Sequence, residues 1–289
     1  HLQVWWWGVI ALALGLVTAL FGVIFAAAQT DMKRLLAYSS IENIGILVSG
    51  VGLAILFKAY DKALLSAIAL TAVLYHAINH AFFKSLLFLA TGAVLHATHE
   101  RSLGKLGGLI HRMPWVAWLA LVGTLAIAGL PPLNGFVSEW LLLQAFLFTP
   151  TLPQSFVNML VPIAAAALVL AAALAAYVMV KFYGVIFLGR PREANLAYAK
   201  DAGRHERLAL SLLAAGCVLL GLFPGAVIRA LDPVNALLVG APVGEAAGHW
   251  LMLAPFGEDR SSYSPVVVLV VVVAVVLVTM QVVHRYYHG

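Results

Sequence analysis

The chain has 289 residues, of which 63% are hydrophobic and only 10% are charged, and its mean hydropathy is +0.99. Soluble domains are about half apolar and about one quarter charged, so this composition excludes a soluble globular domain. The net charge of +5 does not gather among polar, groove-tracking residues, and we therefore expect no nucleic-acid partner.

Seven apolar runs reach or approach the roughly 20 residues that a helix needs to cross a bilayer core. In chain order they cover residues 5–28, 35–57, 63–95, 115–148, 156–188, 208–228 and 265–283. Because these runs fill most of the chain, the sequence predicts an all-α, polytopic membrane protein with about seven transmembrane helices. We expect residues 1–289 to form a single transmembrane domain.

Lysine and arginine are distributed unevenly between the two sides of these runs. One side carries Lys33, Arg34, Arg101, Lys105, Arg112, Arg190, Arg192, Lys200, Arg204, Arg207 and Arg285, and the other carries Lys58, Lys62, Arg229 and Arg260. Basic residues are enriched in cytoplasmic loops, so the first side is predicted to be cytoplasmic. This places a multi-pass protein in the cell (inner) membrane, with its N-terminus outside and its C-terminus in the cytoplasm.

The fourth run, residues 115–148, exceeds the length of a straight crossing and contains its own interruption. Pro131 and Pro132 stand between Gly129 and Gly135. Proline has no N–H to donate and clashes with the preceding helical turn, so this segment predicts a broken helix near the middle of the membrane. Unwound backbone at that depth is tolerated only where protein or a wet cavity satisfies it. A simple packing kink is the alternative.

The third run contains His76, His80 and Lys84 at intervals of four residues. This spacing places the three side chains on one face of a helix, over about 12 Å of its length. Ionisable groups inside a span are costly and therefore candidates for function. Since imidazole donates and accepts protons near neutral pH, the pattern predicts a proton relay. A packing role and a metal or haem site are alternatives, and zinc would need a third ligand such as Glu139.

Three further ionisable side chains lie within the runs. Glu139 follows the proline pair and needs a partner or water at that depth, which a nearby Lys84 ammonium would provide. Glu42 lies inside the second run beside polar residues, and either lines a cytoplasmic water inlet or snorkels to the interface. Lys181, in the fifth run, either joins the relay or snorkels.

Three stretches in order resemble the antiporter-like proton-channel subunits of respiratory complex I, multisubunit cation/proton antiporters and membrane-bound NiFe hydrogenases. They are residues 31–41 (DMKRLLAYSSI), 76–89 (HAINHAFFKSLLFL) and 129–139 (GLPPLNGFVSE). Within that group, residues 42–46, 94–98 and 130–141 are similar to hydrogenase-4 component B and the formate hydrogenlyase membrane subunit. The resemblance covers about residues 1–190 and weakens beyond them.

The resemblance implies a fold and a set of roles. Residues 1–190 would form the second of two inverted five-helix repeats, followed by C-terminal helices over residues 191–289. Lys84 would be the central proton carrier, His76 and His80 its water-linked neighbours, and Glu139 part of the exit path. Lys33 matches a family lysine at a helix start and either carries protons or anchors the loop. The family's first repeat is not among these residues.

The main hypothesis is therefore a proton-translocating membrane subunit of a hydrogenase-4, formate-hydrogenlyase or complex-I-like oxidoreductase. The single cysteine, Cys217, cannot supply the roughly four thiolates of an iron–sulfur cluster, so we expect no cofactor in this chain. The resemblance implies membrane and peripheral partner subunits that carry NiFe and iron–sulfur centres. Two alternatives stay open: a subunit of a multisubunit cation/proton antiporter, moving protons or sodium, and a passive membrane anchor.

Overall fold

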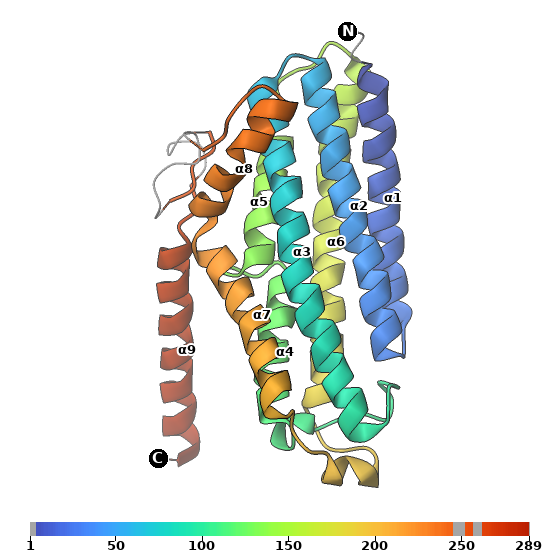
Figure 1. Ribbon diagram of the computed structural model, residues 1–289, viewed down its shortest axis with the longest axis vertical. Helices are drawn as coiled ribbons and strands as arrows, with labels where there is room; N and C mark the ends of the chain where they lie inside the picture. The colour runs from blue at the N-terminus through green and yellow to red at the C-terminus, as the bar shows by residue number, and fades with distance from the viewer. Residues whose placement is uncertain (1–3, 245–251, 257–261, 289) are drawn as a thin grey trace.

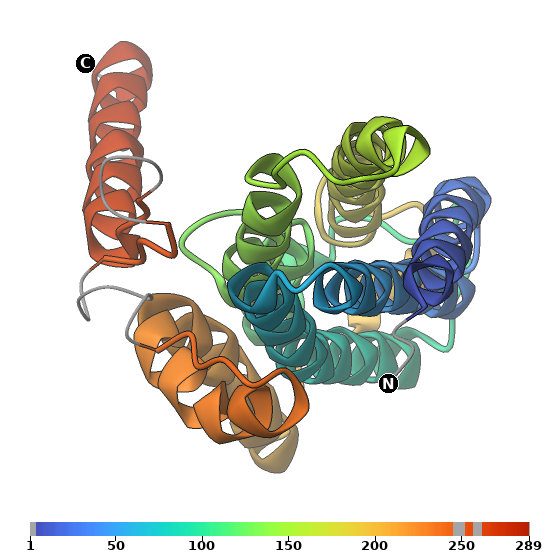
Figure 2. The same cartoon turned by 90° about the horizontal axis from the view of Figure 1, so that it is seen from above.

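The computed structural model describes residues 4–244, 252–256 and 262–288, and within these ranges every regular element is a helix. The α-helices are α1 (Trp5–Ala28), α2 (Met32–Ala59), α3 (Ala63–Thr98), α4 (Pro114–Ile127), α5 (Asn134–Leu147), α6 (Ser155–Phe187), α7 (Arg204–Leu222), α8 (Pro224–Leu238) and α9 (Pro265–His288). Two short 3-10 helices, Leu109–His111 and Ala194–Tyr198, lie in connecting segments. The long helices run side by side to form a bundle (Figures 1 and 2).

The helices account for the predicted membrane crossings. Among the described residues, α1, α2, α3, α6, α7 and α9 are long and apolar enough to span a membrane by length and composition. The shorter helices α4 and α5 follow one another and together make one further pass in two pieces (Figure 1). The prediction of an all-α membrane protein with about seven transmembrane helices, one of them broken, is confirmed.

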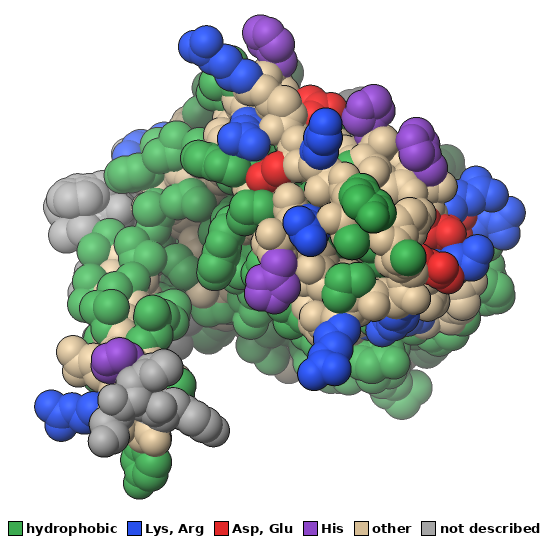
Figure 3. All heavy atoms as spheres, turned by 90° about the horizontal axis from the view of Figure 1, so that it is seen from below, with side chains coloured by type: hydrophobic (Ala, Val, Ile, Leu, Met, Phe, Trp, Pro, Cys, Tyr) green, Lys and Arg blue, Asp and Glu red, His purple; other side chains and the backbone are tan. Residues whose placement is uncertain are grey.

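The two ends of the bundle differ in character. The segments 29–31, 99–113 and 188–203 lie at the lower end in Figure 1, which we call the basic end. Figure 3 looks onto this end and shows lysine, arginine and histidine side chains spread around a smaller number of acidic ones. The loops that the charge distribution predicts to be cytoplasmic therefore lie together at one end of the bundle. The first residues of α3 and the last residues of α8 lie at the opposite end (Figure 1).

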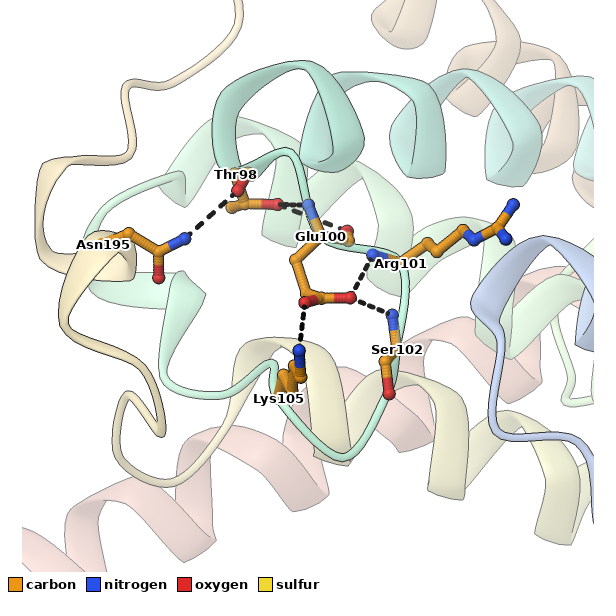
Figure 4. Close-up of polar contacts among 6 residues, drawn as sticks. All are labelled: Thr98, Glu100, Arg101, Ser102, Lys105 and Asn195. Atoms are coloured by element: carbon orange, nitrogen blue, oxygen red, sulfur yellow. Dashed lines mark hydrogen bonds and ion pairs between the residues drawn. The ribbon is translucent and has the colours of Figure 1, made fainter.

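At the basic end, the loop after α3 is clamped by carboxylates. Glu100 accepts hydrogen bonds from the backbone N–H groups of Ser102 and Arg101 and lies 3.5 Å from the Lys105 ammonium (Figure 4). These contacts, the Ser102 amide first, hold the pKa of the Glu100 carboxyl group below its ordinary value. Arg101 pairs at 3.1 Å with Asp31, whose carboxylate caps the start of α2. The loop thus ties the end of α3 to the beginning of α2.

α1 and α2 pack backbone against backbone through glycines. A Cβ atom at Gly22 would overlap the backbone of Glu42, and one at Gly45 would overlap the backbone of Ala19. Small residues at such positions allow close helix approach inside a membrane, where dispersion contacts replace the hydrophobic effect. One side of α2 is therefore held rigidly against α1, which fixes the direction in which its other side points.

The sixth predicted run, residues 208–228, differs from the expected single helix. α7 ends at Leu222 and α8 begins at Pro224, because proline cannot donate the helical hydrogen bond at that position. An N–H at position 224 would have bonded the Leu220 carbonyl, which instead accepts a hydrogen bond from the Tyr75 hydroxyl of α3. The C-terminal part of the chain therefore contains a second interrupted pass.

α9 stands beside the bundle rather than inside it (Figures 1 and 2). Its most apolar window has no buried residues, and nearly all of its described side chains are exposed. A helix that is apolar on every side belongs in a core or in lipid, and this one has no core around it. α9 therefore presents its surface to the bilayer in this chain.

Candidate functional site

The fourth pass is interrupted where the sequence predicts. α4 ends at Ile127 and α5 begins at Asn134, with Pro131 and Pro132 in the connection. Neither proline can donate the backbone hydrogen bond that would continue α4, so the helix stops and restarts. The predicted broken helix is confirmed, and its connection lies at about half the height of the bundle (Figure 1).

Two glycines let the break close tightly around a carboxylate. Gly129 has a φ of +64°, a left-handed conformation that favours glycine. A Cβ atom there would lie 2.6 Å from Oε2 of Glu139. A Cβ atom at Gly135 would overlap the carbonyl oxygen of Ala126, so only glycine lets α5 start against the end of α4. The backbone of the break therefore forms one wall around Glu139.

The α3 ladder, which consists of His76, His80 and Lys84, lies inside the bundle. His76 is 2% exposed, Lys84 is 5% exposed, and His80 is partly buried. The ladder is thus turned away from lipid, as a relay requires. Within the described ranges, no three His, Cys, Asp or Glu residues are grouped as metal ligands.

The imidazole of His76 joins three helices. Its Nδ1 lies 3.0 Å from Oγ of Ser138 on α5, and its Nε2 lies 3.1 Å from Oδ1 of Asn43 on α2. Because an amide oxygen only accepts, this network assigns the ring proton to Nε2 and makes Nδ1 an acceptor. One turn along α3, Asn79 donates to the Asn134 carbonyl at 2.8 Å and to the Ser138 hydroxyl at 3.0 Å. The broken helix is thus bonded directly to α3.

Lys84 connects α3 to α2. Its ammonium donates to the Leu36 carbonyl at 2.8 Å and lies within electrostatic range of the Glu42 carboxyl group. Glu42 is only 1% exposed and also lies within range of Glu139. Charges in a low-dielectric interior influence one another strongly. A change of protonation at Lys84 or Glu139 therefore alters the proton affinity of Glu42, and a change at Glu42 alters that of Lys84.

Several buried polar atoms around this cluster have no hydrogen-bond partner in the part of the chain that the structure describes. They are Ser39 Oγ, Glu42 Oε2, Asn79 Oδ1, His80 Nε2, Thr91 Oγ1 and Asn134 Nδ2. Buried polar groups in proteins are almost always bonded by protein or by ordered water. Their number and their clustering around one helix are typical of a hydrated path rather than of a dry core.

Glu139 also borders a cavity of about 190 Å³ between α2, α5 and α6. Ile46 from α2 and Leu168 from α6 are among the lining residues, and the lining is otherwise apolar apart from Glu139 itself. A water molecule occupies about 30 Å³ in the liquid, so the cavity has room for several. The carboxyl group therefore faces the break on one side and a space large enough for water on the other.

The two remaining lysines of the predicted relay lie at the basic end of the bundle. Lys181 on α6 donates to the carbonyls of Ala27 and Gln29, at 2.7 and 2.9 Å, where α1 ends. Basic side chains commonly satisfy the last carbonyls of a helix, so this contact anchors the end of α1. Lys33 is exposed in the first turn of α2.

The sequence reasoning did not single out three of the polar residues that bond α3 to the broken helix. Asn79 stands three residues after His76, and Asn134 and Ser138 stand four residues apart just before Glu139. Residues at these spacings share a helix face. A polar side chain on the same face as His76, and a pair of polar side chains on one face of the helix that carries Glu139, were therefore available signals. Which helix each stripe faces depends on tertiary packing and was not readable from the spacing.

Residues 1–152 match the family described as NADH:quinone oxidoreductase/Mrp antiporter, TM. Hydrogenase-4 component B of Escherichia coli (strain K12) is 41% identical over 217 residues, which make up 75% of this chain and 32% of that protein. Formate hydrogenlyase subunit 3 of the same strain is 39% identical over 238 residues, 80% of this chain and 39% of that protein. The solved structure of the membrane-bound sulfane sulfur reductase, an archaeal respiratory membrane complex, contains a chain with a TM-score of 0.77 and 29% identity, covering 98% of this chain and 42% of that one. The present chain spans about a third of the length of the two curated relatives.

Proposed function

The chain belongs to the NADH:quinone oxidoreductase/Mrp antiporter family, and from this premise we propose that it carries protons across the bilayer as an antiporter-like membrane subunit. In this proposal the path uses the α3 ladder together with the carboxyl groups of Glu42 and Glu139. Electron transfer takes place in partner subunits. The chain converts the resulting change of charge or conformation into proton movement.

The observation that carries the proposal is the burial of Lys84 against α2. An ammonium inside a membrane protein is expensive, and such groups are typically retained in ion pathways. Here the group is 5% exposed, bonded to the Leu36 carbonyl and within electrostatic range of Glu42. Its counter-charge belongs to a different helix, so a small shift between α2 and α3 changes the strength of their attraction.

This geometry supports a stepwise transfer. When Glu42 takes up a proton, it no longer stabilises the Lys84 ammonium, which then releases a proton to water shared with His80. His76 takes up a proton from this water at Nδ1, on the Ser138 side, and the resulting imidazolium passes a proton on to further water; the Asn43 amide orients the ring and takes up no proton. Each step moves a proton between groups that already lie in one file along α3.

The larger assembly is also part of the proposal. Residues 1–190 act as one five-helix repeat and residues 191–289 as added C-terminal helices, in the cell membrane with the C-terminus in the cytoplasm. Partner membrane and peripheral subunits carry NiFe and iron–sulfur centres, while this chain holds no cofactor. The 41% identity to hydrogenase-4 component B supports a hydrogenase-type or complex-I-like assembly.

The test is a Lys84→Met variant in the purified assembly, reconstituted into vesicles. Methionine keeps the length of the side chain and removes the charge, so proton pumping is expected to fall by at least about tenfold. Lys62→Met, at an exposed position between α2 and α3, is the matched control and should pump normally. Unchanged pumping by an assembled Lys84→Met complex would reject the proposal.

A second candidate is a subunit of a cation/proton antiporter, which the family description itself includes. It would use the same side chains without an electron-transfer partner. Sodium-dependent transport in vesicles that lack hydrogen and quinone substrates would favour this candidate. A passive anchor predicts a third result: Lys84→Met lowers the amount of assembled complex, and each assembled complex transports as before.

A further inference from the structure

The proposed relay leaves a second set of buried polar groups unused, on the part of α3 that runs from His76 toward the opposite end of the bundle. Thr71 there accepts a hydrogen bond at 2.7 Å from Nδ2 of Asn235, which lies on α8. Asn235 is completely buried. Its Oδ1 has no hydrogen-bond partner among the residues that the structure describes. The side-chain amide of Asn235 on α8 is therefore buried inside the bundle with its nitrogen bonded and its oxygen unbonded.

The same region contains two tyrosines next to the broken helix. Tyr75 is completely buried, donates to the Leu220 carbonyl at the end of α7, and lies within electrostatic range of Tyr263. The ring of Tyr263 packs against Phe136 of α5 at 4.9 Å between centroids. Its hydroxyl is buried and has no partner in the described ranges.

The end of α7 lies directly on the break. A Cβ atom at Gly221 would overlap the carbonyl oxygen of Pro132, so the two backbones are in contact. On the α3 side of the break, Asn79 Oδ1 and Asn134 Nδ2 also lack partners within the described part of the chain. Unsatisfied buried groups therefore surround the break and continue along α3 as far as Asn235.

Their extent matches the thickness of a membrane. Thr71 and Lys84 are 13 residues apart on α3, which corresponds to about 20 Å. Thr91, whose hydroxyl is also unpaired, lies seven residues beyond Lys84 and adds about 10 Å toward the basic end. The polar groups along α3 thus cover about the 30 Å of a bilayer core.

We propose that the proton path continues past His76 to Thr71 and Asn235, so that α8 completes the exit at the end of the bundle opposite the basic end. This inference rests on the proposed proton translocation. Water held by Asn79, the tyrosine hydroxyls and Asn235 Oδ1 passes the proton by exchange of hydrogen bonds. The amides orient this water and take up no proton. Because α8 lies outside residues 1–152, the exit is built by a part of the chain that the family match does not cover.

The competing explanation is a simple tie between α8 and α3. A tie accounts for the bond from Asn235 to Thr71, but it leaves the buried Oδ1 atom unbonded in a dry environment, which native proteins avoid. A tie and a path also differ in whether water reaches Asn235. Measurements of the transport rate and of the access of water to Asn235 can therefore distinguish the two explanations.

The first measurement compares Thr71→Val with Thr71→Ser in the full assembly in vesicles. Valine keeps the shape and removes the hydroxyl, whereas serine keeps the hydroxyl. Thr71→Val should lower proton pumping by about tenfold, the rate effect of one lost hydrogen bond, and Thr71→Ser should retain it. Electron transfer by the partner subunits and the yield of complex should be equal in the two variants. Equal pumping by both would overturn the exit.

The second measurement tests whether water reaches Asn235. An Asn235→Cys variant is made in a Cys217→Ala background and treated with a small, charged thiol reagent from each face of the vesicle. Labelling is expected from the face opposite the basic end. Ser49→Cys in the same background is the control, because Ser49 lies in the contact between α1 and α2 and should stay unlabelled. Failure to label Asn235→Cys from either face would also overturn the exit, even if Thr71→Val does not assemble.

Lys84→Met separates the failure of this inference from failure of the proposed function. If Lys84→Met abolishes pumping while Thr71→Val pumps like Thr71→Ser, the relay stands and the exit through α8 is wrong. If Lys84→Met pumps normally, the proposed function fails and the exit fails with it. Loss of pumping in both Lys84→Met and Thr71→Val, together with labelling of Asn235→Cys, supports the complete path.

Discussion

The two faces of α2 are both buried, yet they are built in opposite ways. Toward α1, glycines bring the backbones into contact, and Ser49 satisfies its hydroxyl on the Gly45 carbonyl of its own helix at 2.8 Å. Toward α3, the same helix presents Glu42, whose carboxyl group lies next to the Ser39 hydroxyl and whose Oε2 atom has no hydrogen-bond partner among the described residues. One face is dry and closely packed, and the other is polar and incompletely satisfied.

This difference shows how a membrane helix can be rigid and chemically active at once. Glu42 takes part in both faces. Its backbone packs against Gly22 of α1, while its carboxyl group lies within electrostatic range of Lys84 and Glu139. The dry contact fixes the backbone position of the carboxyl group. The polar face then uses that position to set the distance between charges, on which their interaction depends.

The largest effect is expected when a side-chain atom is added to the closely packed contact between α1 and α2. Gly45→Ala places a Cβ atom against the backbone of Ala19, which cannot move aside, so the free energy of unfolding should fall by about 3 kcal/mol. The melting temperature and the yield of assembled complex measure this effect. Gly92→Ala is the matched control, because a Cβ atom on that α3 glycine meets nothing within 4 Å. Alanine is the better helix former, so the control should be neutral or slightly stabilised.

On the polar face, Glu42→Gln should affect transport far more than stability. Glutamine has the shape of glutamate but cannot ionise, so it removes the charge that acts on Lys84 while preserving the packing against Gly22. Proton pumping is expected to fall by at least about tenfold, with little change in melting temperature. Normal pumping by this variant would show that the polar face of α2 does not take part in transfer.

Two serines, one on each face of α2, allow the faces to be compared by the same substitution to alanine. Ser39 and Ser49 are both completely buried, but Ser49 donates to a carbonyl of its own helix, whereas the Ser39 hydroxyl lies next to the Glu42 carboxyl group. Ser39→Ala removes a hydroxyl that acts on the Glu42 carboxyl group and should lower pumping several-fold, whereas Ser49→Ala should leave pumping unchanged. Equal pumping rates in the two variants would remove the functional distinction between the faces. Melting temperatures check that both variants remain folded.

The sequence allowed the family, most of the spans and the broken helix to be predicted, because each rests on local pattern. Four-residue spacing places His76, His80 and Lys84 on one face, and a proline pair ends a helix in any surroundings. The family resemblance is confirmed by the match over residues 1–152.

The position of Glu42 could not be predicted, because it depends on which way α2 turns. Its sequence context fitted an inlet or a snorkelling side chain equally well. The structure places it 1% exposed and within electrostatic range of Lys84, since glycine contacts with α1 set the rotation of the helix. The break at Pro224 had a local signal, but the apolar run continued through it and hid the end of α7.

The smallest expected effect concerns Glu100, which holds the loop that contacts the N-terminal end of α2, and it tests whether this loop stabilises the position of α2. Contacts with the Ser102 and Arg101 amides hold the pKa of Glu100 below its ordinary value, so its ionised form stabilises the fold above the unfolded pKa of about 4.3. This contribution is lost as the pH falls through the lower pKa of the folded state. Glu100→Gln should therefore lower the melting temperature at pH 7 by no more than about a degree, since its ion pair with the exposed Lys105 lies at the surface, and the difference from the unmodified chain should vanish in acid. Glu193→Gln, at an exposed position, is the control; a deficit of the Glu100 variant that persisted in acid would show that its charge is not what holds the loop.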